Sequence, residues 1–279
     1  MDWEKAKKLT IFFLCLLNIA LFGLIYNNNR AYRLSSSQEQ LITSVLQRNN
    51  IICYVEVLKN FTPMRQIEMQ KSEYDHDLVL DIFVQDKESL RQSMERNRVI
   101  YRNENETLTI DDAEISYRNR NDGGTSNITV EEAERIGREF LRSLSKLGGS
   151  FVADGNLPAE TEEGYLFQFR ESYRGYIINS NYAEITVNEN GVARVEFMYY
   201  KPVFFVGVRR EICSADEALL TVMHGIKDSE ENGSEPRFIT KMDIVYHDNL
   251  SFWATPYYRV FVSGFDKPFL INAYENSML

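Results

Sequence analysis

The feature that most constrains this chain is an apolar stretch near its N-terminus. Leu9 to Tyr26 runs for eighteen residues without a charge, interrupted only by Thr10, Asn18 and Gly23. As a helix it would be about 27 Å long, close to the thickness of a hydrocarbon core. A helix satisfies its own backbone hydrogen bonds, which is a condition for lying in lipid. We therefore predict a transmembrane helix at residues 9–26.

The charges that flank this stretch predict its orientation. Residues 1–8 contain three lysines, whereas Arg30 and Arg33 follow the stretch. The positive-inside rule then favours a cytoplasmic N-terminal tail at residues 1–8. We expect a protein of the cell membrane with a single pass and an extracytoplasmic C-terminal region.

A cleaved signal peptide is the main alternative, because it shares the basic start and the apolar stretch. The stretch is long for a signal peptide, and Tyr26 to Arg30 offers no small-x-small cleavage site. Cys15 also lacks the small preceding residue expected of a lipidated cysteine. These features favour an uncleaved anchor.

Asn18 is the one strongly polar residue near the middle of the predicted span. An unpaired amide in lipid is costly unless a neighbouring helix supplies a partner. Cys15, Asn18, Phe22 and Ile25 share one helical face, which we predict as a contact with another membrane protein. The alternative is that Asn18 bonds to its own backbone.

The charge balance limits the partners of the soluble region. The net charge of the chain is −10. Residues 1–26 are not the source of this negative charge, because they hold more lysines than acidic residues, which are Asp2 and Glu4. Such a surface repels phosphate backbones and anionic lipid heads. We therefore expect no nucleic-acid partner.

The sequence indicates no metal site and no cofactor. The three histidines, His76, His224 and His247, are not at ligand spacing. Cys53 and Cys213 leave two readings open, a disulfide or two small buried thiols, since an odd cysteine count is not a disulfide framework.

Residues 27–122 are predicted as an extracytoplasmic α+β region. A capping box at Ser36–Glu39 opens a helix that ends at Asn49–Asn50. The further elements predicted from apolar and β-branched patterns are strands at Ile51–Val57 and Leu78–Val84, a short helix at Lys87–Arg96, and short strands around Val99, Thr107–Ile110 and Glu114–Arg118. Asn121–Gly124 reads as a turn or linker, so we place a domain boundary after residue 122.

Beyond this boundary one pattern occurs twice, at residues 123–202 and 203–279. Thr129 and Ser214 each begin a capping box, with glutamate three residues later, and each box opens an amphipathic helix. The helices end near Leu147 and Ile226. The strands that follow are predicted at Tyr165–Arg170, Tyr176–Val187, Val192–Tyr200, Ile239–Tyr246, Tyr257–Val262 and Phe269–Ala273, with a hairpin turn at Asn188–Gly191. A helix covering an antiparallel sheet, repeated, is an α+β plan.

We find no motif for catalysis in the sequence. There is no G-x-S-x-G, no phosphate-binding glycine loop and no cysteine beside a suitable histidine. The acidic pairs Asp111-Asp112, Glu131-Glu132 and Glu162-Glu163 are read as solvated faces and helix starts. We therefore predict no catalytic residues.

The ends of the chain resemble the YycI family. The resemblance rests on the start Met1 to Lys7, on Leu46 to Ile52, on Thr62 to Met64, and on the closing runs Pro256 to Val260 and Phe269 to Tyr274. The two helix-plus-strands units resemble the PepSY-like repeats of that family.

The resemblance implies a non-enzymatic regulator in a Gram-positive two-component system for cell wall homeostasis. Its partners would be a YycH-like protein and a sensor histidine kinase like WalK (YycG), contacted through the transmembrane helix and the outer domain. No catalytic residues come with the family. Two alternatives stay open, namely a PepSY-like module that binds peptides or inhibits proteases, and, ranked last, an exported hydrolase.

Overall fold

The computed structural model describes residues 3–84, 86–96, 98–120, 125, 127–155, 158–229, 235–248 and 252–279, with the backbone alone for residues 24–29. It is an α+β protein with an N-terminal apolar helix and a large mixed sheet, so the predicted class is confirmed. Two compact units make up the chain. Unit 1 consists of Met1–Met64, Val208–Asp243 and Tyr258–Leu279, and unit 2 of Arg65–Gly207 and Ile244–Tyr257.

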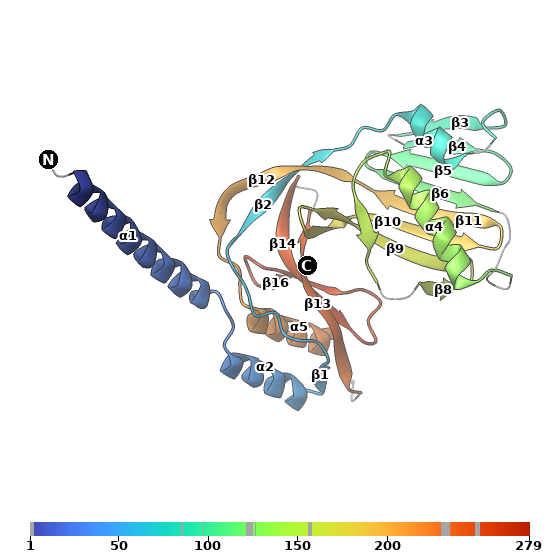
Figure 1. Cartoon of the computed structure of the whole chain (residues 1–279). Coiled ribbons are helices and arrows are strands. Elements are labelled where there is room, and N and C mark those ends of the chain that lie inside the picture. The colour runs from blue at the N-terminus through green and yellow to red at the C-terminus, as the bar shows by residue number, and fades with distance from the viewer. Residues whose placement is uncertain are drawn as a thin grey trace. The chain divides into compact units, whose positions relative to one another are not determined.

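The strands follow one another in the order β12-β2-β14-β13-β10-β11-β6-β5-β4-β3 (Figure 1). Their bounds are β1 Ile51–Cys53, β2 Met64–Lys71, β3 Arg91–Glu95, β4 Arg98–Arg102, β5 Glu106–Asp111, β6 Glu114–Asn119, β7 Phe151–Ala153, β8 Ala159–Thr161, β9 Gly164–Tyr173, β10 Tyr176–Asn188, β11 Gly191–Met198, β12 Tyr200–Arg210, β13 Arg237–His247, β14 Trp253–Val262, β15 Phe269–Asn272 and β16 Ser277–Met278. Neighbours such as β10 and β11 are antiparallel, whereas β13 runs parallel to both β1 and β10. The sheet is therefore mixed.

In unit 2 the helix α4 (Val130–Leu144) lies across β9, β10 and β11 (Figure 1). Thr129 caps it, its side chain accepting a hydrogen bond from the backbone of Glu132 at 3.2 Å. Gly137 allows a close approach, because an added Cβ would lie 3.3 Å from Phe167. Leu144 and Phe197, both fully buried, belong to the core that α4 covers.

Unit 1 holds α1 (Trp3–Ala31), α2 (Ser36–Arg48) and α5 (Ala215–Ser229). The helices α2 and α5 pack against each other, as Figure 1 shows. Leu46 of α2 and Val222 of α5 are buried, and so are the strand residues Ile239, Tyr258 and Ile271. Apolar faces of two helices and a sheet thus form the core of unit 1.

The predicted strand at Leu78–Val84 is wrong, because this segment forms the helix α3 (His76–Phe83). Asp75 caps α3, its side chain accepting a hydrogen bond from the backbone of Asp77 at 3.0 Å. Val79 and Phe83, one turn apart, are its buried residues. A short apolar run fits either a strand or a helix, and here the cap and the spacing of its buried residues favour the helix.

The predicted helix at Lys87–Arg96 is also wrong. Arg91–Glu95 forms β3, the first strand of a hairpin in which Glu95 lies opposite Arg98. Arg96 takes a left-handed backbone conformation with φ of 56°, which suits a tight turn. Pairing with β4 overrides the helix propensity of this polar segment.

The remaining elements agree with the prediction, with local shifts. The capping box of α2 joins Ser35 and Gln38, one residue before the predicted box. The strand β1 ends at Cys53 rather than Val57. The short strands β4 to β6 are confirmed, but β2 and β12 were not predicted, and neither were the short strands β7, β8 and β16.

The helices α4 and α5 start where the two repeated boxes predict them, and the strands expected after each helix are confirmed. The hairpin turn between β10 and β11 is confirmed by the pairing of Asn188 with Gly191. The predicted linker at Asn121–Gly124 lies outside the described residues. The domain boundaries after residues 122 and 202 stay predictions.

Candidate functional site

The apolar helix is the first candidate site. Within α1 the segment Trp3–Gly23 is long and apolar enough to cross a membrane, with a mean hydropathy of 1.7, and none of it is buried by the rest of the chain. Both a membrane anchor and a signal sequence have this character. Its orientation stays a prediction.

The predicted contact face on α1 begins with Cys15, Asn18 and Phe22, all exposed, while the side chain of Ile25 lies outside the described residues. The amide nitrogen of Asn18 donates a hydrogen bond to the carbonyl oxygen of Leu14 at 2.8 Å. This is the backbone bond that the sequence left as an alternative. Within the described chain the Oδ1 atom of Asn18 accepts no hydrogen bond, so this acceptor remains for a neighbour. The contact with another protein stays a prediction.

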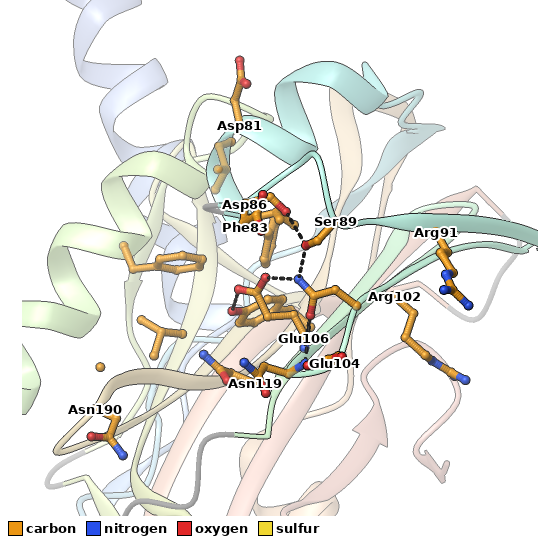
Figure 2. A pocket seen from close by; sticks show the side chains of 18 of the residues that line it. Asp81, Phe83, Asp86, Ser89, Arg91, Arg102, Glu104, Glu106, Asn119 and Asn190 are labelled. Atoms are coloured by element: carbon orange, nitrogen blue, oxygen red, sulfur yellow. Dashed lines mark hydrogen bonds between the residues drawn. The ribbon is translucent and has the colours of Figure 1, made fainter.

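A second candidate is a pocket of about 1140 Å³ in unit 2 (Figure 2). Its walls come from α3 and the loop after it, from β3 to β6, from α4 and from the β10–β11 turn. Its apolar lining includes the ring of Phe83, whose centroid lies 5.5 Å from that of Tyr117 and 5.4 Å from that of Phe140. Segments far apart in sequence therefore line the pocket.

One wall of the pocket is a closed hydrogen-bond network (Figure 2). The carboxylate of Glu106 accepts hydrogen bonds from the hydroxyl of Tyr117 at 2.9 Å and the amide of Asn103 at 3.0 Å. The Oδ1 atom of Asn103 accepts from the backbone of Asn105 and Glu106 at 2.9 and 2.6 Å. Burial, followed by the bond to Glu106, raises the pKa of Tyr117 well above its ordinary value. These bonds fix the wall, so the pocket is preformed.

Another part of the lining is cationic. Arg91 of β3 and Arg102 of β4 lie directly opposite each other, and Figure 2 shows their guanidinium groups on the same side of the pocket. Neither forms an ion pair with any residue that the structure describes. Like charges directly opposite each other are unfavourable. With Asp86 and Glu104 also lining the pocket, the site can attract charges of both signs.

The positions of the acidic pairs agree with the prediction that they lie on solvated faces and at helix starts. Asp111 and Asp112 form ion pairs with Arg98 and Lys71, each at 2.6 Å. Glu131 and Glu132 lie in the first turn of α4, and Glu163 pairs with Arg118. Among the described residues no group of three histidine, cysteine or acidic side chains could hold a metal ion.

The two cysteines of unit 1 outside α1, Cys53 and Cys213, are free thiols. The thiol of Cys53 donates to the carbonyl oxygen of Val55 at 3.1 Å. Burial raises the pKa of both thiols, that of Cys213 to about 12. Of the two alternatives that the sequence left open, the structure has two unpaired thiols, each of them half-buried.

A buried carboxyl in unit 2 was not predicted. Glu171 of β9 is 3% exposed and accepts a hydrogen bond from the amide of Asn181, which also donates to the carbonyl oxygen of Tyr200 at 2.6 Å. It lies beside a break in the β9–β10 register between Ile178 and Tyr182. Burial raises the pKa of Glu171 to about 7, although the bond from Asn181 acts in the opposite direction.

A buried guanidinium in unit 1 was also missed. Arg259 is 1% exposed and donates two hydrogen bonds to the carboxylate of Asp243, at 2.9 Å from Nε and 2.7 Å from Nη2. Its guanidinium carbon lies 5.2 Å from the ring centroid of Phe261. Lys241 approaches the same carboxylate at 3.7 Å. Alternation along β13 and β14 could have placed Asp243 and Arg259 on strands, but it could not have shown that their side chains meet.

The fold and these sites define an α+β protein with an apolar N-terminal helix and a preformed pocket. No family model matches the chain, and no curated protein matches it. Its structure is similar to that of an uncharacterized protein from Eubacterium rectale, with 13% identity, a TM-score of 0.53, and coverage of 82% of this chain and 90% of that one. At this identity the similarity shows a shared fold.

Two further solved structures are distantly similar to the chain. The YpeB C-terminal domain from Bacillus megaterium has 12% identity and a TM-score of 0.41, over 75% of this chain and 96% of that domain. YycH from Bacillus subtilis has 10% identity and a TM-score of 0.47, over 75% of this chain and 54% of YycH.

Proposed function

We propose that this chain is a non-enzymatic, membrane-anchored regulator of a cell-envelope sensor histidine kinase of the WalK (YycG) type. It acts with a YycH-like partner, through contacts of α1 in the membrane and of the extracytoplasmic region. The support from sequence is the YycI-like start before the apolar helix and the YycI-like closing strands.

The observation that carries this proposal is the exposed apolar surface of α1. Ile11, Phe12, Ile19 and Phe22 are each between 60% and 72% exposed. Large apolar side chains in such a continuous row need lipid or other helices to cover them. A helix held permanently in the membrane can then contact the helices of a kinase.

Substitution of Asn18 tests the helix contact. We expect Asn18→Leu to change kinase output in cells, because it removes the polar group that a neighbouring helix can bind. The size of the effect should be about 0.5–2 kcal/mol of helix association, or roughly a two- to thirtyfold change. The measurement is transcription of a kinase-dependent reporter at matched protein levels.

The control uses the opposite face of the helix. Leu16, 50% exposed, lies on the side of α1 away from Asn18. A photoreactive side chain at position 18 should crosslink to the kinase or its partner, and one at position 16 should crosslink far less. Replacement of residues 9–26 by an unrelated apolar helix with no loss of regulation would refute the helix contact.

The second candidate function is an extracytoplasmic PepSY-like module that binds peptides or inhibits proteases. The pocket of unit 2 favours it, because the lining combines aromatic rings, amides and charges of both signs. The full chain in detergent micelles should then inhibit a protease or bind a peptide library. Failure in both assays would remove this candidate.

A further inference from the structure

The strand β3 is a free edge of the sheet. It ends the strand order and pairs with β4 alone among the described strands. All five of its residues are exposed, including Met94 with 72% of its surface. An exposed edge carries unpaired backbone donors and acceptors, which can pair with another strand.

The hairpin shows which backbone groups are free. Two residues separate Glu95 from Arg98, and a turn of this length is closed by hydrogen bonds between the residues that flank it. Because bonded and non-bonded pairs alternate along an antiparallel ladder, Ser93 also bonds to β4. The amide and carbonyl groups of Gln92 and Met94 therefore face away from the sheet.

The sequence of β3 is self-complementary in charge. It reads Arg91-Gln92-Ser93-Met94-Glu95, with opposite charges at equal distances from Ser93. If a second copy pairs antiparallel about a two-fold axis at Ser93, each Arg91 lies opposite Glu95 of the second copy. Gln92 then lies opposite Met94 of the second copy, where the free backbone groups of both strands meet.

The charged ends of β3 are not ion-paired within the described residues. Neither Arg91 nor Glu95 forms an ion pair with any residue in the described part of the chain. Arg91 lies opposite Arg102, a pairing of like charges. A carboxylate from a second copy would offset this repulsion. Pairing of two chains thus offsets a repulsion between like charges that one chain leaves in place.

We propose that two copies of this chain associate through β3, forming a continuous antiparallel sheet with Ser93 opposite Ser93 of the second copy. The interface is isologous, since the same five residues serve both sides. Four backbone hydrogen bonds join Gln92 and Met94 to their counterparts, and two ion pairs set the register.

Disulfide formation tests the register directly. Opposite residues of a non-hydrogen-bonded pair have Cα atoms about 4.5 Å apart, within the range of a disulfide. Ser93→Cys, in a full chain with Cys15, Cys53 and Cys213 changed to alanine, should form linked dimers in detergent under mild oxidation. Met94→Cys is the matched control, because its counterpart lies roughly 9 Å away.

Charge reversal tests the ion pairs. Arg91→Glu places like charges opposite each other across the interface and should lower the linked fraction of Ser93→Cys about tenfold, since two pairs become repulsive. The hairpin is not weakened, because the new carboxylate faces Arg102. Glu95→Arg should act alike across the interface, although it also places an arginine opposite Arg98 within the hairpin. The double variant Arg91→Glu/Glu95→Arg keeps that hairpin contact and should restore linkage, which separates the two effects.

Two results would overturn the proposal. One is a linked fraction of Ser93→Cys no greater than that of Met94→Cys, which is also the result if copies associate only through α1. The other is a linked fraction that Arg91→Glu leaves unchanged.

Discussion

Unit 1 and unit 2 bury charged side chains of opposite sign and stabilise them by different means. In unit 1 the guanidinium of Arg259 faces the carboxylate of Asp243 with two hydrogen bonds. In unit 2 the carboxyl of Glu171 faces the neutral amide of Asn181. An opposite charge favours the ionised form, whereas the hydrogen bond from a neutral amide offsets only part of the desolvation. The stability of unit 2 should thus depend on pH through Glu171.

The largest effect is expected from breaking the ion pair of unit 1. Asp243→Ala leaves the guanidinium of Arg259 buried without its carboxylate, which typically costs about 4 kcal/mol. The free energy of unfolding of the full chain in urea, measured in detergent, should fall by about this amount. A loss below about 1 kcal/mol would show that other groups stabilise Arg259 equally well.

Replacement of the titrating carboxyl of Glu171 in unit 2 should raise the stability of the chain, whereas Asp243→Ala should lower it. The pKa of Glu171 is about 7 in the folded chain and 4.5 as the ordinary value. The folded state therefore binds more protons, and stability is lost as pH rises from about 4.5 through 7. Glu171→Gln keeps the acceptor for Asn181 and should stabilise the chain at pH 8 by up to about 3 kcal/mol.

The pH profile separates this effect from simple repacking. The stability of Glu171→Gln relative to the parent chain should rise between pH 5 and pH 8, whereas at pH 4 the two should be nearly equal. Burial lowers the pKa of His247, but the same histidine is present in both chains. A constant difference at all pH values would contradict the assignment to Glu171.

The smallest effect is expected from the second cation beside Asp243. Lys241 lies 3.7 Å from that carboxylate, and its side chain is 43% exposed. Exposed pairs contribute little because water screens them. Lys241→Ala should therefore lower the free energy of unfolding by less than about 1 kcal/mol in the same urea experiment. A loss as large as that of Asp243→Ala would mean that both cations act as one cluster.

Elements with strong local signals were predictable from sequence. The helix starts after Thr129 and Ser214 and the turn at Asn188–Gly191 depend on residues close together in sequence, and their positions are confirmed. The segment Leu78–Val84 was mistaken for a strand, because its short apolar run fits both periodicities. The edge strand β3 was mistaken for a helix, because its pairing with β4 is not visible in its own residues.

The candidate sites show the same limit. The apolar helix can be predicted from the sequence because one continuous segment defines it. The pocket of unit 2 cannot be predicted in this way, since Phe83, Glu106 and Phe140 come from three separate elements. The polar run Asn103–Glu106 marks a turn, but nothing in it indicates the contact with Tyr117. The partners of Arg259 and Glu171 likewise depend on strand pairing.

Unit 1 is assembled from three separated segments, and this has a consequence for how the chain matures. The strand β1, made early, pairs with β13, which is made late. Until Phe269–Asn272 has been synthesised, α2 and β1 lack the rest of their core. A nascent or C-terminally truncated chain would therefore expose Leu46 and Ile51, which the folded unit buries. Chaperones and proteases can bind such exposed apolar residues, so they act on chains in which the last strands have not yet docked.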